Sequence, residues 1–344
     1  MPDDRTTVTE LATALGMLGR VDLPDALARR PVELAVPDGT WHHLGSLHAS
    51  GRFSDEFATA YANGRAFLEA DDALRGRRPR LIEWTGGRRP PGDEVAPVDL
   101  RIDHVYLVSC KYLSRTIANA SPARLFEGLL ATTGEWEQTD WYEVVAPVEL
   151  RALYDACRAA TGLPDLPDDP GALGAEDRQR LRRALPGRTY PPQARPAYRA
   201  LCARVSAASA ECWARNVARR NAAERMVWRL LRIGNAAYYL LGADPRRSLR
   251  LRVASSWDWR QTYRLTGLDI TAAASGQPQV DWVADYVERA SGRARQVRGH
   301  VEVRWSHGRF AQPPEAKVYL DTPSDELPGY FALEPGADQP ELWD

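Results

Sequence analysis

The sequence predicts a protein of mixed α/β (α+β) class, and three observations point to this class. Residues 54–145 have the patterns of a helix, three strands, a helix and a strand. Residues 148–245 are dominated by helical patterns, and strand patterns return after residue 246. Helices and strands mixed in this way build an α/β core rather than an all-helical or all-β domain.

The length of 344 residues is more than one compact core usually holds. We therefore expect three parts: an N-terminal segment with the α/β core (1–147), a helical region (148–245) and a C-terminal β-rich region (246–344). This division follows the change from mixed to helical to strand patterns along the chain.

The N-terminal part begins with a short helix over about residues 8–18. Residues 32–47 read as short strands around the turn Asp38-Gly39. Ser54 has the character of an N-cap, because acidic residues follow it and apolar residues then recur at helical spacing. These signals predict an amphipathic helix over residues 54–74.

Three short strands follow this helix. The first covers residues 81–84, and the other two form a β-hairpin over 98–102 and 105–108 with Asp103-His104 as the reversal. Ser121 and Pro122 have the pattern of a helix start, and residues 141–145 read as a strand. Further helices are expected over 150–160, 175–185, 197–219 and 223–241, and strands over 249–254, 262–267, 300–306 and 317–321.

Composition and charge exclude several classes of protein. The net charge is −1, so any nucleic-acid contact has to come from a local patch. The first residues carry no apolar signal core, and no run of residues is long enough to span a membrane. Four cysteines without CxxC spacing indicate buried thiols in a reducing compartment. We expect a cytoplasmic protein without a membrane partner.

Lysine is rare in this chain, and one lysine ends the hairpin. Lys111 and Lys317 are the only lysines among 45 basic residues. Antiparallel pairing brings the start of one strand beside the end of the next, so Asp99 is expected to meet Ser109 and Lys111 at one sheet edge. An ammonium group at such a site suits a role that a planar guanidinium cannot fill.

This arrangement resembles the PD-(D/E)XK, or restriction-endonuclease-like, nuclease superfamily. Its motif is an acid on the second strand and an acid, any residue and a lysine on the third; Asp99 and Ser109-Cys110-Lys111 match those places. The resemblance implies an αβββαβ core, with additional C-terminal strands and a helical region in this chain. It also implies hydrolysis of DNA phosphodiester bonds with Mg²⁺ or Mn²⁺, in restriction or anti-phage defence.

The resemblance also assigns roles to these residues. Asp99 and the backbone carbonyl of Cys110 would bind the metal, and Lys111 would orient water and stabilise the transition state. Ser109 departs from the pattern, because a serine replaces the second acid. Candidates for a substitute carboxylate are Glu83, which we favour, and Glu56 or Glu69 on the preceding helix. The alternative is a surface hairpin in which Asp99 and Lys111 form a cross-strand ion pair.

A second set of residues competes for the same role. Glu315-Ala316-Lys317 is a true ExK sequence, with Glu302 as the upstream acid, but its apolar run follows the lysine. Expected contacts to nucleic acid come from basic residues in two loops, where arginine and histidine attract phosphate. They are Arg88, Arg89, Arg304, His307 and Arg309.

Two other functions remain compatible with the sequence. One is a nucleic-acid-binding module on the same fold whose catalytic site has decayed at Ser109. The other is a structural subunit whose helical or C-terminal region contacts a protein partner. The sequence also leaves a homo-oligomer open.

Overall fold

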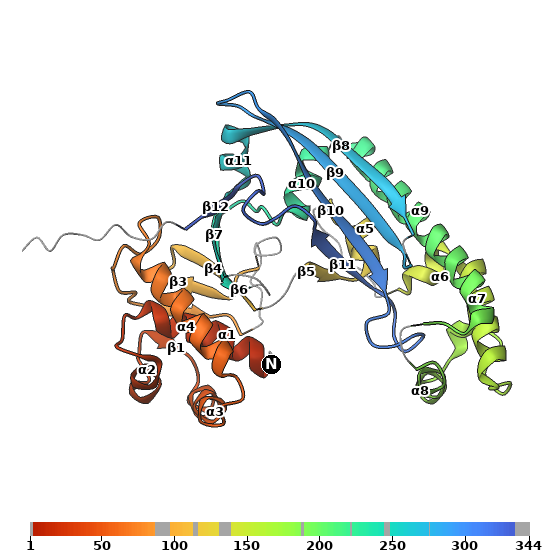
Figure 1. Cartoon of the computed structure of the whole chain (residues 1–344), viewed down its shortest axis with the longest axis horizontal. Coiled ribbons are helices and arrows are strands. Elements are labelled where there is room, and N and C mark those ends of the chain that lie inside the picture. The colour runs from red at the N-terminus through yellow and green to blue at the C-terminus, as the bar shows by residue number, and fades with distance from the viewer. Residues whose placement is uncertain are drawn as a thin grey trace, which may run out of the picture. The chain divides into compact units, whose positions relative to one another are not determined.

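We describe the chain from a computed structural model that covers residues 3–86, 97–112, 116–130, 139–186, 189–220, 222–243, 248–274 and 276–333. The chain folds into two compact units that interleave along the sequence (Figure 1). Unit 1 contains Met1–Arg115, Arg232–Thr262 and Pro323–Asp344, and unit 2 contains Thr116–Leu231 and Tyr263–Thr322.

The mixed α+β class is confirmed, because helices and two sheets are present in the described residues. The expected segments 1–147, 148–245 and 246–344 do not coincide with the two units. Those boundaries follow local composition, whereas the units are defined by strand pairs and helix contacts between residues far apart in sequence.

Two helices of unit 1 lie in backbone contact. They are α1 (Asp4–Met17) and α4 (Ser54–Glu69), which confirms the helix expected from residue 54. A Cβ atom on Gly64 would lie 2.0 Å from the Thr13 carbonyl oxygen and 2.9 Å from the Cα of Gly16. Glycine is therefore required at the crossing, and this close approach fixes how α1 lies on the sheet.

The segment expected as short strands over 32–47 is mostly helical. Only β1 (Leu34–Ala35) is extended, and α3 (Asp38–Ala49) follows it. Trp41, Leu44 and Leu47 recur at helical spacing and are buried. Asp38-Gly39 therefore opens a helix instead of forming a turn between strands. A short helix, α2 (Leu23–Arg29), precedes this region.

The sheet of unit 1 has seven strands in the order β1-β2-β3-β4-β6-β7-β12. Strand β3 runs antiparallel to β2 and β4, β4 runs parallel to β6, and β7 runs antiparallel to β6 and β12. One face of the sheet packs on the core that includes α1 and α4. The strands after β1 are β2 (Ile82–Trp84), β3 (Leu100–Ile102), β4 (Tyr106–Tyr112), β6 (Tyr238–Ala243), β7 (Ser248–Val253) and β12 (Tyr330–Ala332).

Strand β6 corrects the helix expected over 223–241. Helix α10 (Ala223–Leu230) ends early, Arg232 adopts a left-handed φ of 57°, and the chain then enters β6. All six residues of β6 are buried. A strand buried on both faces is apolar throughout, so its pattern resembles that of a buried helix.

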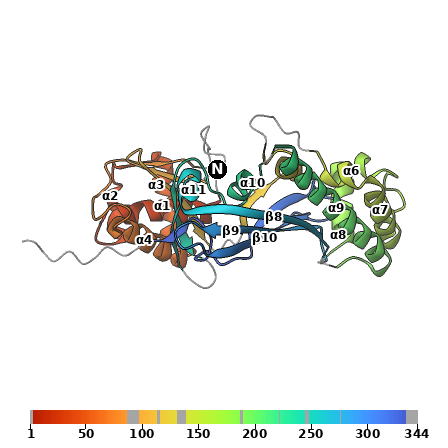
Figure 2. The same cartoon turned by 90° about the horizontal axis from the view of Figure 1, so that it is seen from above.

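Unit 2 is built on an antiparallel sheet of five strands in the order β5-β11-β10-β9-β8. The long helix α9 (Arg195–Arg220) lies along one face of this sheet, as Figures 1 and 2 show. Val280, Trp282, Ala284 and Tyr286 alternate as buried residues along β9. The strands are β5 (Thr116–Ala120), β8 (Tyr263–Ala273), β9 (Gln279–Glu288), β10 (Ala294–Arg304) and β11 (Glu315–Leu320).

Short helices complete the two units, and one of them replaces an expected strand. Residues 141–145 form α6 (Trp141–Val145), because the Asp140 carboxylate accepts from the Tyr142 N–H at 2.9 Å and caps the helix. The other helices are α5 (Pro122–Phe126), α7 (Pro147–Thr161), α8 (Ala175–Ala184), α11 (Ser256–Thr262) and the 3₁₀ turns Pro170–Ala172 and Pro192–Ala194.

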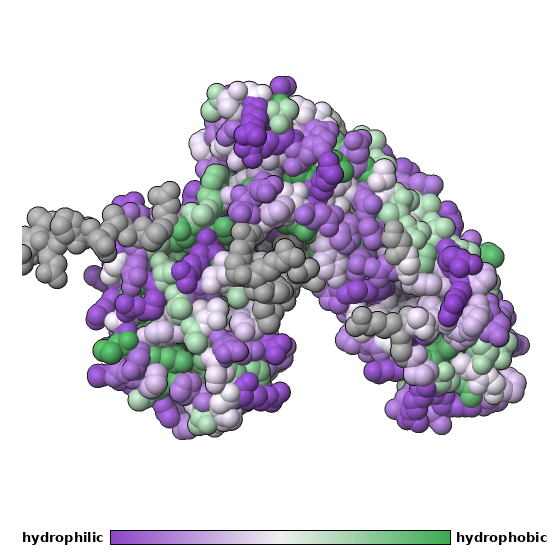
Figure 3. All heavy atoms as spheres, viewed as in Figure 1, coloured by the Kyte–Doolittle hydropathy of each residue, from purple (hydrophilic) through white to green (hydrophobic). Residues whose placement is uncertain are grey.

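Hydrophilic residues cover most of the face seen in Figure 3, and apolar patches between them are small. No helix within the described ranges is long and apolar enough to cross a membrane. The four cysteines are buried free thiols, as their spacing predicts.

Candidate active site

The hairpin of unit 1 brings Asp99 beside the Ser109-Cys110-Lys111 segment, as predicted. The Asp99 backbone N–H donates to the Val108 carbonyl at 2.8 Å, which continues the β3–β4 ladder. The Asp99 carboxylate oxygen Oδ2 accepts from the Cys110 N–H at 2.7 Å and from the Ser109 hydroxyl at 3.3 Å. Ser109 is therefore a hydrogen-bond partner of Asp99.

The reversal between these strands is the predicted one. Asp103 and His104 both adopt positive φ, at 50° and 59°, as a two-residue hairpin turn requires. The Asp103 carboxylate accepts from the backbone N–H groups of Arg80 and Leu81 at 2.8 and 2.9 Å. This contact ties the turn to the segment that enters β2 and so fixes the register in which Asp99 meets Ser109.

A carboxylate that sequence reasoning missed lies at the same point. Glu10, on α1, is only 5% exposed, and the Trp84 indole N–H donates to its Oε2 atom at 2.5 Å. Burial, followed by the negative charge of Asp99, raises the pKa of Glu10 to about 8, while the charge of Lys111 acts in the opposite direction. Glu10, Asp99 and Lys111 thus form one electrostatic cluster, which we call the Glu10 cluster.

Helix α1 carries Glu10 into this cluster by its contact with α4. The Gly16–Gly64 crossing holds α1 against the sheet, where Trp84 of β2 and Cys110 of β4 face it. No local signal distinguishes Glu10 from the other glutamates of the N-terminal part. The position of Glu10 depends on the contact between α1 and α4, and in the sequence only Gly16 and Gly64 indicate that contact.

The backbone carbonyls of Cys110 and Lys111 point to opposite sides of strand β4. A Cβ on Gly242 of β6 would lie 1.9 Å from the Lys111 carbonyl oxygen, so that oxygen faces β6. Successive carbonyls of an extended strand alternate in direction, so the Cys110 carbonyl points to the side on which Asp99 lies. Burial, and then the charges of Asp99 and Glu10, raise the pKa of the Cys110 thiol well above its usual value.

Glu56 lies next to the end of β4 but has a different partner. It is buried on α4 and forms an ion pair with Arg5 of α1, with Oε1 3.0 Å from Nε. Burial, and then the charges of Glu56 and Asp55, raise the pKa of Tyr112. The first turns of α1 and α4 therefore lie near Tyr112, which follows Lys111. Glu56 forms its ion pair with Arg5, and its charge acts on Tyr112.

Glu83 does not join the cluster, although we favoured it as the substitute acid. It pairs across the sheet with Arg101, and its carboxylate lies 3.1 Å from His104 Nδ1 at the hairpin reversal. Asp99 lies at the opposite end of that hairpin. The Glu83 side chain is 43% exposed, in contrast to Glu10. Glu69, the remaining candidate, pairs with Arg65 at 2.9 Å within α4.

The competing ExK set is assembled in unit 2 as a network of ion pairs. Lys317 lies opposite Glu302 in the β10–β11 register, and its Nζ is 3.6 Å from Glu315 Oε2. Burial opposes ionisation of Glu315, yet hydrogen bonds from Ser306 and the charge of Lys317 lower its pKa overall. We call this set the Glu315 cluster.

The three residues of unit 2 that we predicted to contact nucleic acid each have a different partner in the structure. Arg304 pairs with Glu302 at 2.9 Å and donates to the Tyr319 hydroxyl at 3.0 Å. His307 Nε2 lies 3.5 Å from Glu315. Arg309 turns inward and stacks on the Tyr190 ring, 3.9 Å from its centroid. Arg88 and Arg89 lie outside the described residues.

The donor set of the Glu10 cluster fits a hard divalent ion of the Mg²⁺ type. Within the described ranges, no three His, Cys, Asp or Glu side chains are grouped so that they could hold a metal. Mg²⁺ is usually bound through one or two carboxylates, with waters and substrate phosphate completing its octahedron. Asp99, Glu10 and the Cys110 carbonyl supply oxygen ligands of that kind.

Comparisons with protein-family models, curated proteins and solved structures gave no match.

Proposed function

We propose that this protein is a metal-dependent nuclease that hydrolyses DNA phosphodiester bonds at the Glu10 cluster. In this proposal Glu10, from α1, takes the place of the acid that Ser109 lacks in the PD-(D/E)XK pattern. The observation that carries the proposal is a buried carboxylate, Glu10, whose charge interacts with the part-buried Asp99 and with one lysine.

A purely structural ion pair would not need this arrangement. An Asp99–Lys111 pair would already be neutral, and a further carboxylate that is buried, as Glu10 is, adds desolvation and repulsion. Proteins retain such unfavourable desolvation and repulsion at functional sites, where the carboxylate is needed for metal binding or catalysis. A divalent cation between Glu10 and Asp99 would offset their repulsion.

The strand arrangement of unit 1 supports the same proposal. Helix α4 precedes the antiparallel strands β2, β3 and β4, and β4 pairs in parallel with β6. In chain order, α10 comes directly before β6. Unit 1 therefore supplies the first helix, the three strands and the last strand that the resemblance requires, whereas α10, the helix before that last strand, belongs to the first segment of unit 2.

Each residue of the cluster has a role in this reaction. Asp99, Glu10 and the Cys110 carbonyl would hold the ion, and Ser109 and the Cys110 N–H orient the Asp99 carboxylate through its Oδ2 atom. A bound Mg²⁺ or Mn²⁺ supplies Lewis-acid activation of the phosphate and of water. The Lys111 ammonium orients the attacking water and stabilises negative charge that develops on the phosphoryl oxygens.

A cleavage assay on linear and circular DNA with Mg²⁺ or Mn²⁺ tests this function. Asp99→Asn and Glu10→Gln are expected to lower the rate at least ~100-fold, because each removes one charged ligand. Glu83→Gln is the matched control and should stay within about threefold of wild type, since Glu83 lies at the other end of the hairpin.

Two results would contradict the proposal. Unchanged cleavage in Asp99→Asn and Glu10→Gln would exclude this site. DNA binding without metal-dependent cleavage by the wild-type protein would instead indicate a non-catalytic binding module.

A further inference from the structure

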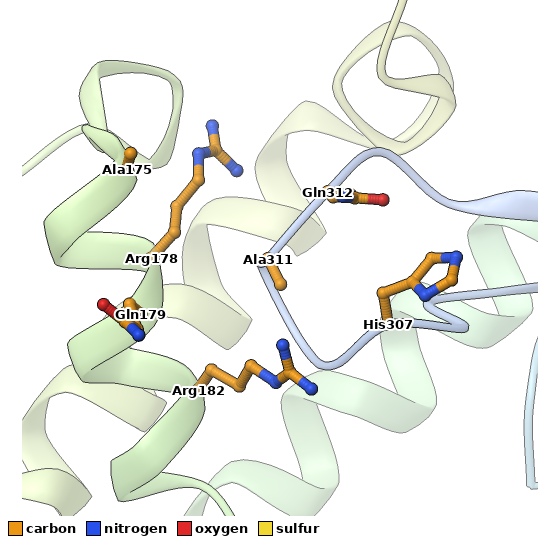
Figure 4. A pocket seen from close by; sticks show the side chains of 7 residues that line it. All are labelled: Ala175, Arg178, Gln179, Arg182, His307, Ala311 and Gln312. Carbon is orange, nitrogen blue, oxygen red and sulfur yellow. The ribbon is translucent and has the colours of Figure 1, made fainter.

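A cationic cavity lies in unit 2, apart from the residues of the Glu10 cluster. It has a volume of about 250 Å³ and lies between α8 and the loop that joins β10 to β11. Figure 4 shows Arg178 and Arg182 of α8 extending toward this loop, which carries His307 and Gln312. None of the described residues that line the cavity is acidic.

The spacing of residues on α8 explains the charge of this cavity. Positions 175, 178, 179 and 182 are separated by three and four residues, so they share one face of the helix. The acidic residues of the first turn, Glu176 and Asp177, do not line the cavity, and Asp177 pairs with Arg180 at 3.6 Å. Helix α8 therefore directs two arginines to the loop and places its carboxylates elsewhere.

Arg178 is fixed in position by two backbone carbonyls. Its Nε donates to Leu173 at 3.1 Å, and its Nη1 donates to Phe310 at 2.7 Å. A guanidinium has five N–H donors, so further donors remain for a ligand. The charge of Arg178 acts on Asp140, but that carboxylate caps α6, and Arg178 makes no ion pair with any described residue.

Arg182 is held by the loop through its aliphatic stem. Gly308 has a φ of 107°, and a Cβ at this position would lie 3.0 Å from the Cγ, Cδ and Nε atoms of Arg182. Glycine thus allows the loop backbone to lie directly on the arginine stem. Arg182 is exposed and has no ion-pair partner in the part of the chain that the structure describes.

From this geometry we propose that the cavity between α8 and the β10–β11 loop binds a phosphodiester group of nucleic acid through Arg178 and Arg182, with His307 at its rim. Arg178, which two carbonyls hold in place, and Arg182 form no ion pair among the described residues, and their guanidinium groups match the oxygens of a phosphate, which arginine binds in a bidentate manner. The His307 side chain is 60% exposed and available for a further contact. Identifying the anion as nucleic acid rests on the proposed function.

The site also refines the expected contacts of unit 2. Of Arg304, His307 and Arg309, only His307 lines the cavity, because Arg304 pairs with Glu302 and Arg309 stacks on Tyr190. The arginines that carry the site come from α8, which composition did not single out. A phosphate contact of this kind positions nucleic acid without reading its sequence.

Salt-dependent DNA binding by the full chain tests the inference. Binding of a labelled duplex and of a single strand is measured by anisotropy in EDTA across a salt series. Arg182→Gln should weaken binding about fivefold and reduce the slope of log K against log[salt] by about 0.9, the value for one phosphate contact. Arg183→Gln removes the same charge from the same helix outside the cavity and should leave the slope unchanged. Circular dichroism verifies that both variants fold.

The outcomes separate this inference from the proposed function. Equal effects of Arg182→Gln and Arg183→Gln would overturn the site, even if the wild-type protein cleaves DNA. A specific effect of Arg182→Gln would support the site, even if no cleavage is found. Binding of inorganic phosphate that depends on Arg182, without binding of either oligonucleotide, would overturn the assignment to nucleic acid.

Discussion

The Glu10 cluster of unit 1 and the Glu315 cluster of unit 2 use the same residue types in contrasting ways. Each contains one of the two lysines of the chain and more than one carboxylate. In the Glu315 cluster, Lys317, His307 and Ser306 all act on Glu315, and the pKa of Glu315 falls. In the Glu10 cluster, burial and Asp99 raise the pKa of Glu10 to about 8.

This difference separates a satisfied network from a site that can take a ligand. The groups of the Glu315 cluster neutralise each other, as in structural ion pairs on the polar face of a sheet. In the Glu10 cluster, ionisation of Glu10 beside Asp99 would add more negative charge than the lysine offsets, and burial makes that ionised form costly. An ExK match in the sequence therefore does not identify the more reactive lysine.

The largest expected difference between the clusters is in catalysis. Lys111→Ala should lower metal-dependent DNA cleavage at least ~1,000-fold, because it removes the group that stabilises the transition-state charge. Lys317→Ala removes the other lysine and should remain within about threefold of wild type. Rates measured under single-turnover conditions decide this, and the reverse pattern would move the active site to unit 2.

A smaller difference is expected in the stability of the metal-free protein. Because the pKa of Glu10 is raised to about 8 in the folded state, its proton is held while the unfolded chain releases it near the ordinary value of 4.5. Stability therefore falls as pH rises from about 4.5 to 8. Glu10→Gln removes this loss and should be more stable than wild type at pH 9 by up to about 5 kcal/mol, since the pKa rises from 4.5 to about 8 and one pKa unit corresponds to ~1.4 kcal/mol.

Urea unfolding in EDTA at pH 5, 7 and 9 measures this effect. The advantage of Glu10→Gln should grow with pH. A variant that is less stable than wild type at pH 9 would mean that Glu10 is a structural partner and not an excess charge.

The smallest expected effect concerns Glu315 and has the opposite sign. Its lowered pKa means that the folded state favours the ionised form, so its contribution is present above the ordinary pKa and is lost as pH falls through the lowered value. Glu315→Gln should cost about 0.5–1 kcal/mol at pH 7, as is usual for partly exposed ion pairs, and less at pH 3. Thermal unfolding at both pH values measures this loss of stability. If Glu315→Gln were more stable than wild type at pH 7, the two clusters would not differ in the way described.

Local sequence patterns were sufficient to predict the hairpin but not the strand that pairs with it, β6. Asp103-His104 and the alternating residues beside it predict a turn and two strands, and these place Asp99 next to Lys111. Strand β6 was missed because Tyr238–Ala243 is apolar throughout, which suits a buried helix equally well.

Glu10 was missed for a different reason. Its position depends on the α1–α4 crossing at Gly16 and Gly64, and no periodicity along one segment reports a contact 48 residues away. Glu83 had the stronger local signal, a charge in an apolar strand, but its strand directs it to His104. Long-range packing, rather than local pattern, therefore selects the carboxylate.

The interleaving of the two units affects the order in which the site is assembled during synthesis. Strand β4 ends at Tyr112, and its parallel neighbour β6 begins at Tyr238, after the first segment of unit 2. At about 5–20 residues per second, a ribosome needs on the order of 10 s to make the intervening chain. During that interval Lys111 lies on an unpaired strand edge, so the nascent chain has to protect this edge from aggregation before the sheet closes.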